Sequence, residues 1–180
     1  MDWILDRLLP RYEFRSRYTR EVAAPPDAVW HAMWAVTGSE LPVTRALMKV
    51  RTAGRSRMAG PLLDGMSLVE LGRREPAEIV LGQVGKFWRV RPVKAPRATV
   101  DPAAFAAFAE PGWARGAMSI QLTPTAGGTL VAAETRVATT DRASRLRFAP
   151  YWTLIRLGGA GFIRLELLRA IARRAEAARC

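Results

Sequence analysis

The stretch GTLVAAETRVATTDRASRLRFAPYWTLIRLGGAGFIRLELLRAIARRAEAA, from Gly128 to Ala178, decides the fold. Its first part, Thr129 to Thr139, is rich in Val and Thr and contains no Gly or Pro, which predicts a β-strand. Asp141 is a good N-cap for the long helical segment that we expect to follow. The arginines near the end of that segment suit the negative pole of a helix.

Two features interrupt the helical segment. Pro150 has no backbone N–H, so a continuous helix would kink there. The glycine-rich segment 158–161 is a second weak point, at which the helix would break into two pieces. Its spacing does not match a phosphate-binding loop, so we interpret it as a hinge or a cavity wall. Apolar residues point in nearly every direction around the axis, which predicts a helix that is buried on more than one side.

The size and composition of the chain are those of one globular domain. It has 180 residues, of which 49% are hydrophobic, and this is enough for a substantial core. We expect a single domain over residues 1–180, with a short amphipathic segment at 1–10. The N-terminus lacks the basic region of a signal peptide, and the apolar stretch 146–168 contains four charged residues. We therefore expect a cytoplasmic protein.

The net charge of +12 is the strongest anomaly in the composition, and it comes almost wholly from arginine. One interpretation is an anionic partner, such as nucleic acid or an anionic membrane surface, and the other is an ordinary solvated surface. Because the arginines are scattered through every segment, we favour the second interpretation. We do not expect nucleic acid as a partner, and we leave peripheral contact with an anionic membrane open. The oligomeric state is not predicted.

Short helices and strands precede the final strand. A period of two from Tyr12 to Val22 predicts a half-buried strand. Further strands are expected at 67–74, 77–90 and 113–124, and helices at 3–9, 28–36, 40–51 and 101–112. We expect an exposed loop at 52–65, irregular chain at 92–102, and a bulge or bend at Gly82 and Gly85. This order predicts an α+β fold, with helices packed on a curved antiparallel sheet.

Four stretches of sequence accompany this order: VAAPPDAVW (22–30), EIVLGQVGKFW (78–88), ETRV (134–137) and RFAPYW (147–152). Together with the order of elements, they resemble a bacterial branch of the START-like superfamily. This superfamily is also called Bet v 1-like, SRPBCC or polyketide cyclase/dehydrase. The resemblance covers Tyr12 to Ala178. It implies the helix-grip fold, in which a curved antiparallel sheet wraps a long C-terminal helix around an apolar cavity.

The resemblance implies a cavity but no single activity, because the superfamily includes lipid carriers, hormone receptors, cyclases, co-chaperones and oxygenase subunits. We expect the chain to bind a hydrophobic small molecule or lipid. One alternative is a cyclase/dehydrase-type enzyme that acts on a polyketide-like or other apolar substrate. A further alternative is a basic module that docks on anionic lipid or nucleic acid. We expect no cofactor.

Few residues are available for nucleophilic catalysis or metal binding. His31 is the only histidine and lies outside the apolar stripe of its helix, so we expect it to be exposed and without a catalytic role. Cys180 is the only cysteine, which excludes an intramolecular disulfide. The chain cannot supply the His-His-carboxylate iron site of the Rieske-oxygenase branch, and we predict no metal site.

The candidate site consists of acidic residues, one arginine and four aromatic residues. Glu134 and Arg136 share one face of the last strand. They form an ordinary surface pair if that face is outward, or orient a polar ligand head if it lines the cavity. Glu134 is a candidate acid–base residue, and Glu70 is a second one. The candidate cavity walls, for which core packing is the alternative, are Trp88, Trp113, Tyr151 and Trp152.

Overall fold

The structure is a computed structural model that describes residues 2–51, 60, 68–89, 93–95, 101–157 and 160–178. These residues form two compact units. Unit 1 consists of the described residues of 1–17, 68–121 and 133–156, and unit 2 of those of 18–67, 122–132 and 157–180. That residues 1–180 make a single domain stays a prediction.

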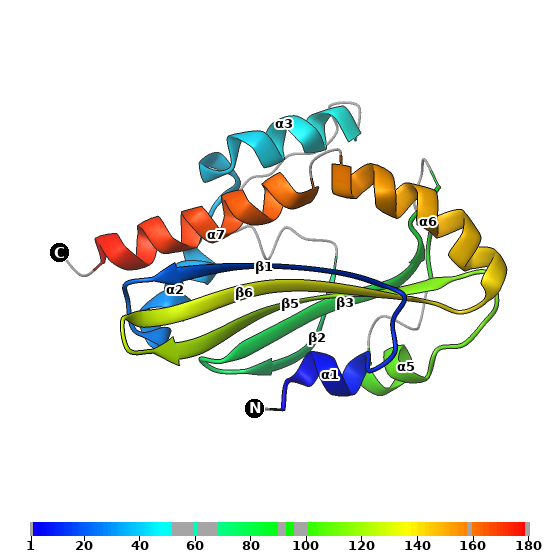
Figure 1. The fold of residues 1–180 in the computed structure, drawn as a ribbon, viewed down its shortest axis with the longest axis horizontal. Coiled ribbons are helices and arrows are strands. Elements are labelled where there is room, and N and C mark those ends of the chain that lie inside the picture. The colour runs from blue at the N-terminus through cyan, green and yellow to red at the C-terminus, as the bar shows by residue number, and fades with distance from the viewer. Residues whose placement is uncertain are drawn as a thin grey trace. The chain divides into compact units, whose positions relative to one another are not determined.

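Six strands form one antiparallel sheet within the described part of the chain. They are β1 (Phe14–Val22), β2 (Val69–Arg74), β3 (Glu78–Lys86), β4 (Val93–Lys94), β5 (Ala114–Thr125) and β6 (Gly128–Thr139). The strand order is β1-β6-β5-β3-β2, and β4 also pairs with β3 (Figure 1). Because β5 and β6 are neighbours joined by only two residues, they form the predicted hairpin.

The described helices begin close to the predicted positions and end close to them, except that the helix predicted at 101–112 ends at Ala107. They are α1 (Ile4–Leu8), α2 (Pro26–Ala35), α3 (Pro42–Arg51), α5 (Pro102–Ala107), α6 (Arg142–Leu157) and α7 (Ala160–Ala177), with a short 3-10 helix, η1 (Gly38–Glu40). Asp141 caps α6 as predicted, because its Oδ1 accepts the N–H of Ser144 at 2.8 Å. None of the described helices has the length and apolarity that crossing a membrane requires. This order confirms the α+β helix-grip fold, with two short helices after the first strand.

In unit 1 the sheet is covered on both faces. Alternation along the strands sends successive side chains to opposite sides. Val80 and Val84 of β3 pack with Leu5 of α1 and Phe105 of α5, all of them buried. On the other side α6 packs through Phe148, which is 1% exposed and contacts residues of β1 and the chain after β3 (Figure 1).

In unit 2 the C-terminal helix α7 packs against α2 and α3. It buries Leu168 and Ile171 completely. Glu166 of α7 accepts the backbone N–H groups of Val43 and Thr44, each at 2.8 Å, and so satisfies two of the unpaired donors in the first turn of α3. One side chain thus fixes both the start of α3 and its position on α7.

The helical segment consists of two helices. α6 continues through Pro150 and ends at Leu157, and α7 begins at Ala160, on either side of the predicted glycine break. Gly158 and Gly159 themselves lie outside the described residues. The prediction that the segment is buried on more than one side is wrong for α6. Its Leu146, Leu154 and Leu157 are 66%, 68% and 82% exposed, because α6 packs on the sheet with only one of its sides.

The predicted irregularity in the sheet lies in a different strand. β3 pairs with β5 in unbroken register from Glu78 to Gly85, whereas the register of β2 shifts between Glu70 and Gly72. A glycine is needed at Gly82 for another reason: a Cβ there would lie 2.9 Å from the carbonyl oxygen of Gly116. The predicted loop 52–65 lies outside the described residues except for Gly60, and the predicted irregular segment 92–102 contains the short strand β4.

The turn between β5 and β6 provides a test of the hairpin. Gly128 has φ +145°, and a Cβ there would collide with the carbonyl oxygen of Val22. We expect Gly128→Ala to lower the free energy of unfolding by about 1–3 kcal/mol, measured by urea denaturation with far-UV circular dichroism. The adjacent Gly127 has an ordinary φ, and a Cβ there would have no described atom within 4 Å, so Gly127→Ala should change that free energy by less than about 0.5 kcal/mol. Equal effects of the two substitutions would refute this account of the turn.

Candidate functional site

The side of the sheet that faces α6 in unit 1 carries an aromatic cluster. Its centre is the buried Phe148, and its ring centroid lies 4.8 Å from that of Phe14, 5.6 Å from Tyr151 and 5.9 Å from Trp152. The full cluster consists of Phe14, Phe87, Trp88, Phe148, Tyr151 and Trp152. Most of these pairs are edge-on or tilted, which is a favourable geometry for aromatic contacts.

Glycines on the strands make room for one of these rings. A Cβ on Gly116 would lie 3.3 Å from the ring of Phe87, and one on Gly85 would lie 3.0 Å from it. The ring therefore lies directly on the backbone of β3 and β5. Larger side chains at these two positions would push Phe87 away from the sheet and disturb the cluster.

Two buried polar atoms lie on this same face without a hydrogen-bond partner among the described residues: Ser16 Oγ and Gln83 Oε1. Ser16 follows Phe14 by two positions, and Gln83 lies opposite Gly116 in the β3–β5 register, so alternation places both on the face that carries the aromatic cluster. Leaving a buried acceptor unsatisfied costs about 1–3 kcal/mol. Native structures contain few such groups, and each one calls for an explanation.

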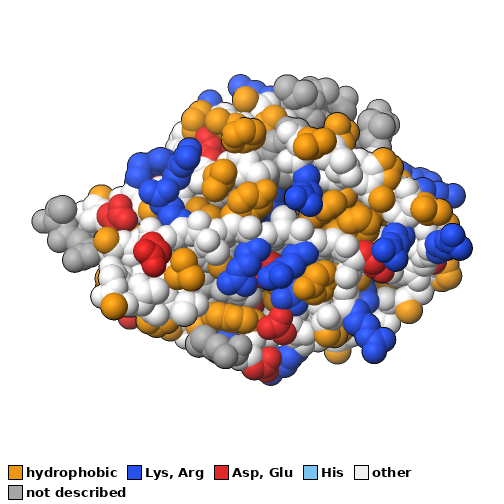
Figure 2. Space-filling view, in the orientation of Figure 1, with side chains coloured by type: hydrophobic (Ala, Val, Ile, Leu, Met, Phe, Trp, Pro, Cys, Tyr) orange, Lys and Arg blue, Asp and Glu red, His pale blue; other side chains and the backbone are white. Residues whose placement is uncertain are grey.

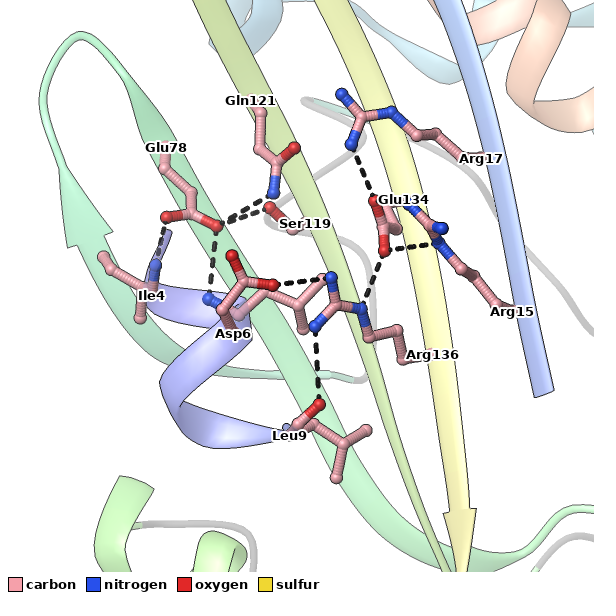
Figure 3. Close-up of polar contacts among 11 residues, drawn as sticks. Ile4, Asp6, Leu9, Arg15, Arg17, Glu78, Ser119, Gln121, Glu134 and Arg136 are labelled. Atoms are coloured by element: carbon pink, nitrogen blue, oxygen red, sulfur yellow. Dashed lines mark hydrogen bonds and ion pairs between the residues drawn. The ribbon is translucent and has the colours of Figure 1, made fainter. Parts of the chain in front are cut away.

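The opposite face of the sheet carries a charge cluster around Glu134, whose side chain is fully buried. Arg15 Nε and Arg17 Nη1 of β1 both lie 2.9 Å from its carboxylate oxygens, and Arg136 Nε lies 2.7 Å away (Figure 3). Arg136 also contacts Asp6 Oδ1 of α1 at 2.7 Å. The cluster therefore links β1, β6 and α1.

The electrostatics of this cluster favour an ionised Glu134. Burial alone would raise the pKa of Glu134, but hydrogen bonds from Arg15 and Arg136 outweigh burial, and the pKa lies below its ordinary value of 4.5. A carboxylate that is ionised at neutral pH has no proton to donate. Its lone pairs are also occupied by guanidinium groups, so this environment is unsuited to proton transfer.

A second buried carboxylate, Glu78 at the start of β3, is a residue that sequence reasoning missed. Its oxygens accept the N–H groups of Ile4 and Leu5 at 2.5 and 3.3 Å and the hydroxyl of Ser119 at 2.8 Å (Figure 3). Glu78 thus caps the N-terminus of α1 from a distant strand. The sequence did contain a signal: Glu78 begins the apolar run EIVLG, which is expected to be buried. An acidic residue in such a buried run is almost always paired, so Glu78 could have been predicted to have a partner.

The predicted site residues divide between the two faces. Trp88, Tyr151 and Trp152 belong to the aromatic cluster, whereas Glu134 and Arg136 belong to the charge cluster on the other face. Since all five lie in unit 1, the structure brings the three aromatic residues together but separates them from the charged pair.

The other two predicted residues lie apart from both clusters. Trp113 packs beside Phe108, with ring centroids 6.2 Å apart, and Lys86 Nζ lies 4.5 Å from the centre of its ring. Glu70 forms an ion pair with Arg73 at 2.6 Å, and its side chain is 42% exposed. Such a surface pair has the environment of an ordinary solvated carboxylate.

Metal-binding side chains are not gathered in the described part of the chain, where no three His, Cys, Asp or Glu residues lie close enough to hold an ion. His31 is exposed, and its Nδ1–H donates to the carbonyl oxygen of Asp27 at 2.8 Å, one turn back on α2. This contact is local to the helix.

A family model described as "Protein of unknown function (DUF2867)" matches residues 8–156, and the chain belongs to that family. None of the curated proteins matches it.

Among solved structures, the chain is similar to a protein from Mesorhizobium loti, with 12% identity, a TM-score of 0.43, and coverage of 89% of this chain and 98% of that one. It is also similar to the di-domain ARO/CYC StfQ from the steffimycin biosynthetic pathway, with 13% identity, a TM-score of 0.44, and coverage of 92% and 52%. A third is TTHA0849 from Thermus thermophilus, with 12% identity, a TM-score of 0.37, and coverage of 93% and 100%. The element order and strand topology described above are those of the START-like, or SRPBCC, fold.

Glu134 in the buried charge cluster and Glu70 in the exposed ion pair allow a matched test of how burial changes the cost of losing a carboxylate. Glu134→Gln removes the carboxylate that three arginines share, and we expect the free energy of unfolding to fall by about 3–5 kcal/mol. Glu70→Gln removes an exposed partner of Arg73 and should cost less than about 1 kcal/mol. Chemical denaturation of both variants measures the difference. Similar small losses would mean that Glu134 is solvated.

The lowered pKa of Glu134 predicts that the folded protein becomes less stable in acid. Because the pKa of Glu134 is lower in the folded than in the unfolded chain, its contribution is present above the unfolded value near 4.5 and is lost as the pH falls through the folded value. Glu40, whose pKa is lowered to about 2 chiefly by hydrogen bonding with Arg174, acts in the same direction. We expect the melting temperature to drop between about pH 5 and pH 2, and to drop less steeply in Glu134→Gln. If the melting temperature fell equally steeply with pH in Glu134→Gln and in the unsubstituted chain, Glu134 would not be the source of the acid sensitivity.

Proposed function

We propose that the chain binds a hydrophobic small molecule or lipid at the α6-facing side of the sheet in unit 1. The observation that carries this proposal is a pair of buried polar atoms, Ser16 Oγ and Gln83 Oε1, which have no hydrogen-bond partner among the described residues and lie on a face that is otherwise apolar and aromatic. Ligand sites commonly combine apolar walls with a few polar groups that fix orientation. Because β6 and β5 lie between β1 and β3, the two atoms are about 14 Å apart across the sheet, so a separate polar group on the ligand would satisfy each of them.

The aromatic residues supply the apolar part of the proposed site. Trp88 and Tyr151 are only partly buried, whereas Phe148 and Trp152 are buried behind them. A ligand that covers the partly buried rings would remove further aromatic surface from water, and such burial is favourable in proportion to its area. The family's fold is consistent with this class of ligand. A cytoplasmic location stays a prediction.

The alternative, a cyclase or dehydrase that uses Glu134 as its acid–base residue, has less support. Glu134 lies on the face away from the aromatic cluster, and its environment favours the ionised form. We assign Glu134 and Arg136 to the attachment of α1 instead. Unchanged turnover by Glu134→Gln on any substrate that the protein converts would agree with this, whereas loss of turnover by a folded variant would revive the enzymatic role.

The first experiment is native mass spectrometry of the protein purified from its own cells, followed by displacement of 1-anilinonaphthalene-8-sulfonate by fatty acids and aromatic polyketides. We expect a co-purifying mass or specific displacement by one compound class. A protein without bound mass whose probe fluorescence no compound changes would contradict the proposal, as would a core impermeable to ligands.

A pair of glutamine substitutions then locates the site. Gln83→Met removes an unsatisfied acceptor, so we expect the free energy of unfolding to hold or rise by about 1 kcal/mol, while the affinity for a hydroxyl-bearing ligand falls about five- to tenfold. The matched control is Gln121→Met. Gln121 lies on the opposite face and donates to Glu78 at 3.3 Å, so this variant should lose stability and keep its affinity. If both variants bind equally, Gln83 does not contact the ligand.

A further inference from the structure

The outer face of α6 is apolar although it is exposed. Leu146, Leu154 and Leu157 are 66%, 68% and 82% exposed. At 3.6 residues per turn, positions i, i+8 and i+11 fall within about 80° of one another around the helix axis. The three leucines therefore form one stripe, opposite the side on which Phe148 and Trp152 are buried.

Two arginines of α6 flank this stripe: at 3.6 residues per turn, Arg142 lies about 40° before it and Arg147 about 20° after it, whereas Arg145 and Arg156 lie about 80–100° away from it. α6 contains four arginines and no acidic residue, and all four are exposed: Arg142, Arg145, Arg147 and Arg156. Within the part of the chain that the structure describes, no carboxylate forms an ion pair with any of them. Figure 2 shows basic and apolar side chains next to one another over the region where Figure 1 draws α6.

The nearest acidic groups offset the positive charge of this face only in part. Asp141 and Glu13 line a shallow groove of about 590 Å³ beside the first turns of α6, together with Arg142 and Arg145. Asp141 accepts the N–H groups of Gly112 and Ser144, and Glu13 accepts the N–H of Thr139 at 2.8 Å. Both carboxylates accept backbone N–H groups and neither forms an ion pair with these arginines, so the four guanidinium groups outnumber them and remain available to an external anion.

We propose that the outer face of α6 docks on an anionic lipid bilayer, with the helix lying in the plane of the interface. The three leucines would enter the boundary between headgroups and acyl chains, and the arginines would reach lipid phosphates along their flexible stems. A helix of 16 residues is about 24 Å long, enough to spread these groups over several lipids.

Charge complementarity selects this occupant over two others. A second copy of the chain would bring two sets of arginines together across a two-fold axis, and like charges oppose such a contact. Nucleic acid would satisfy the arginines but leave the leucine stripe without an apolar partner. An anionic membrane surface offers both a negative potential and an apolar layer.

Docking is independent of the proposed ligand binding, since it uses the outer side of α6 and leaves the inner aromatic side in place. The two proposals fail separately. Substitutions of Ser16 or Gln83 should leave vesicle binding unchanged, and substitutions of the outer leucines should leave probe displacement unchanged.

The test is flotation of the full chain with vesicles of phosphatidylcholine alone or with about 30% phosphatidylglycerol, at low and high salt. We expect binding only to the anionic vesicles, weakened by salt. The double variant Leu146→Ser/Leu154→Ser should bind at least about tenfold more weakly. Arg142→Gln/Arg147→Gln, which removes the two arginines beside the stripe, should bind about 25-fold more weakly, or about fivefold for each charge.

Matched controls come from α3, where Val43 is 45% exposed and Arg45 is exposed. Val43→Ser and Arg45→Gln change the same types of group on another helix and should bind as the unsubstituted chain does. Equal losses in the α3 and α6 variants would overturn the proposal. So would equal binding to neutral vesicles, or leucine variants that bind normally. Salt-sensitive binding to a DNA duplex with no vesicle binding would overturn it too, and would assign the arginines to nucleic acid.

Discussion

Two buried carboxylates, Glu78 and Glu134, fix the position of the N-terminal helix on the sheet, and the arrangement of unit 1 depends on them. Glu78 accepts the first backbone donors of α1, and Glu134 orients Arg136 toward Asp6 on the same helix. A buried ion pair is a poor source of net stability, because desolvation offsets its Coulombic attraction. Its stronger effect is on specificity, since any other placement of α1 would take two hydrogen-bond donors from buried Glu78 and the Asp6 contact from Arg136.

The two faces of the sheet in unit 1 carry different kinds of side chain. The face under α1 carries charged and polar groups that largely pair with one another. Four of its buried atoms have no partner among the described residues: Gln121 Oε1, Arg115 Nε, and Nε and Nη2 of Arg74. The face under α6 has aromatic rings and two acceptors without partners among the described residues. Atoms without a described partner therefore occur on both faces, and it is residue type that distinguishes them: only under α6 do such atoms lie beside a cluster of aromatic rings.

Much of this fold could be predicted from local patterns. Alternation identified the strands, Asp141 marked the start of α6, and the glycines before Ala160 marked the end of a helix. The same alternation placed Glu134 and Arg136 on one face. It could not say which face, because that depends on the partner helix, and the partner is set by contacts 130 residues apart in sequence, such as Asp6 with Arg136. Glu78 was missed for the same reason: its partners, the backbone N–H groups of Ile4 and Leu5 and the side chains of Ser119 and Gln121, are 41 to 74 residues away in sequence.

The exposed leucines of α6 show that a helix with apolar residues on all sides need not be buried on all sides. Apolar residues on all sides of a helix usually predict burial on all sides, but a second structural arrangement fits the same pattern. One side packs on protein, and the other is apolar because its environment is not plain water. The arginines decide between the two arrangements. A helix buried on every side has no place for four guanidinium groups without carboxylate partners, whereas a helix at an anionic interface has a partner for each. The excess of arginine, which is evenly scattered along the sequence, is therefore locally organised on α6, where no acidic residue within the helix balances it.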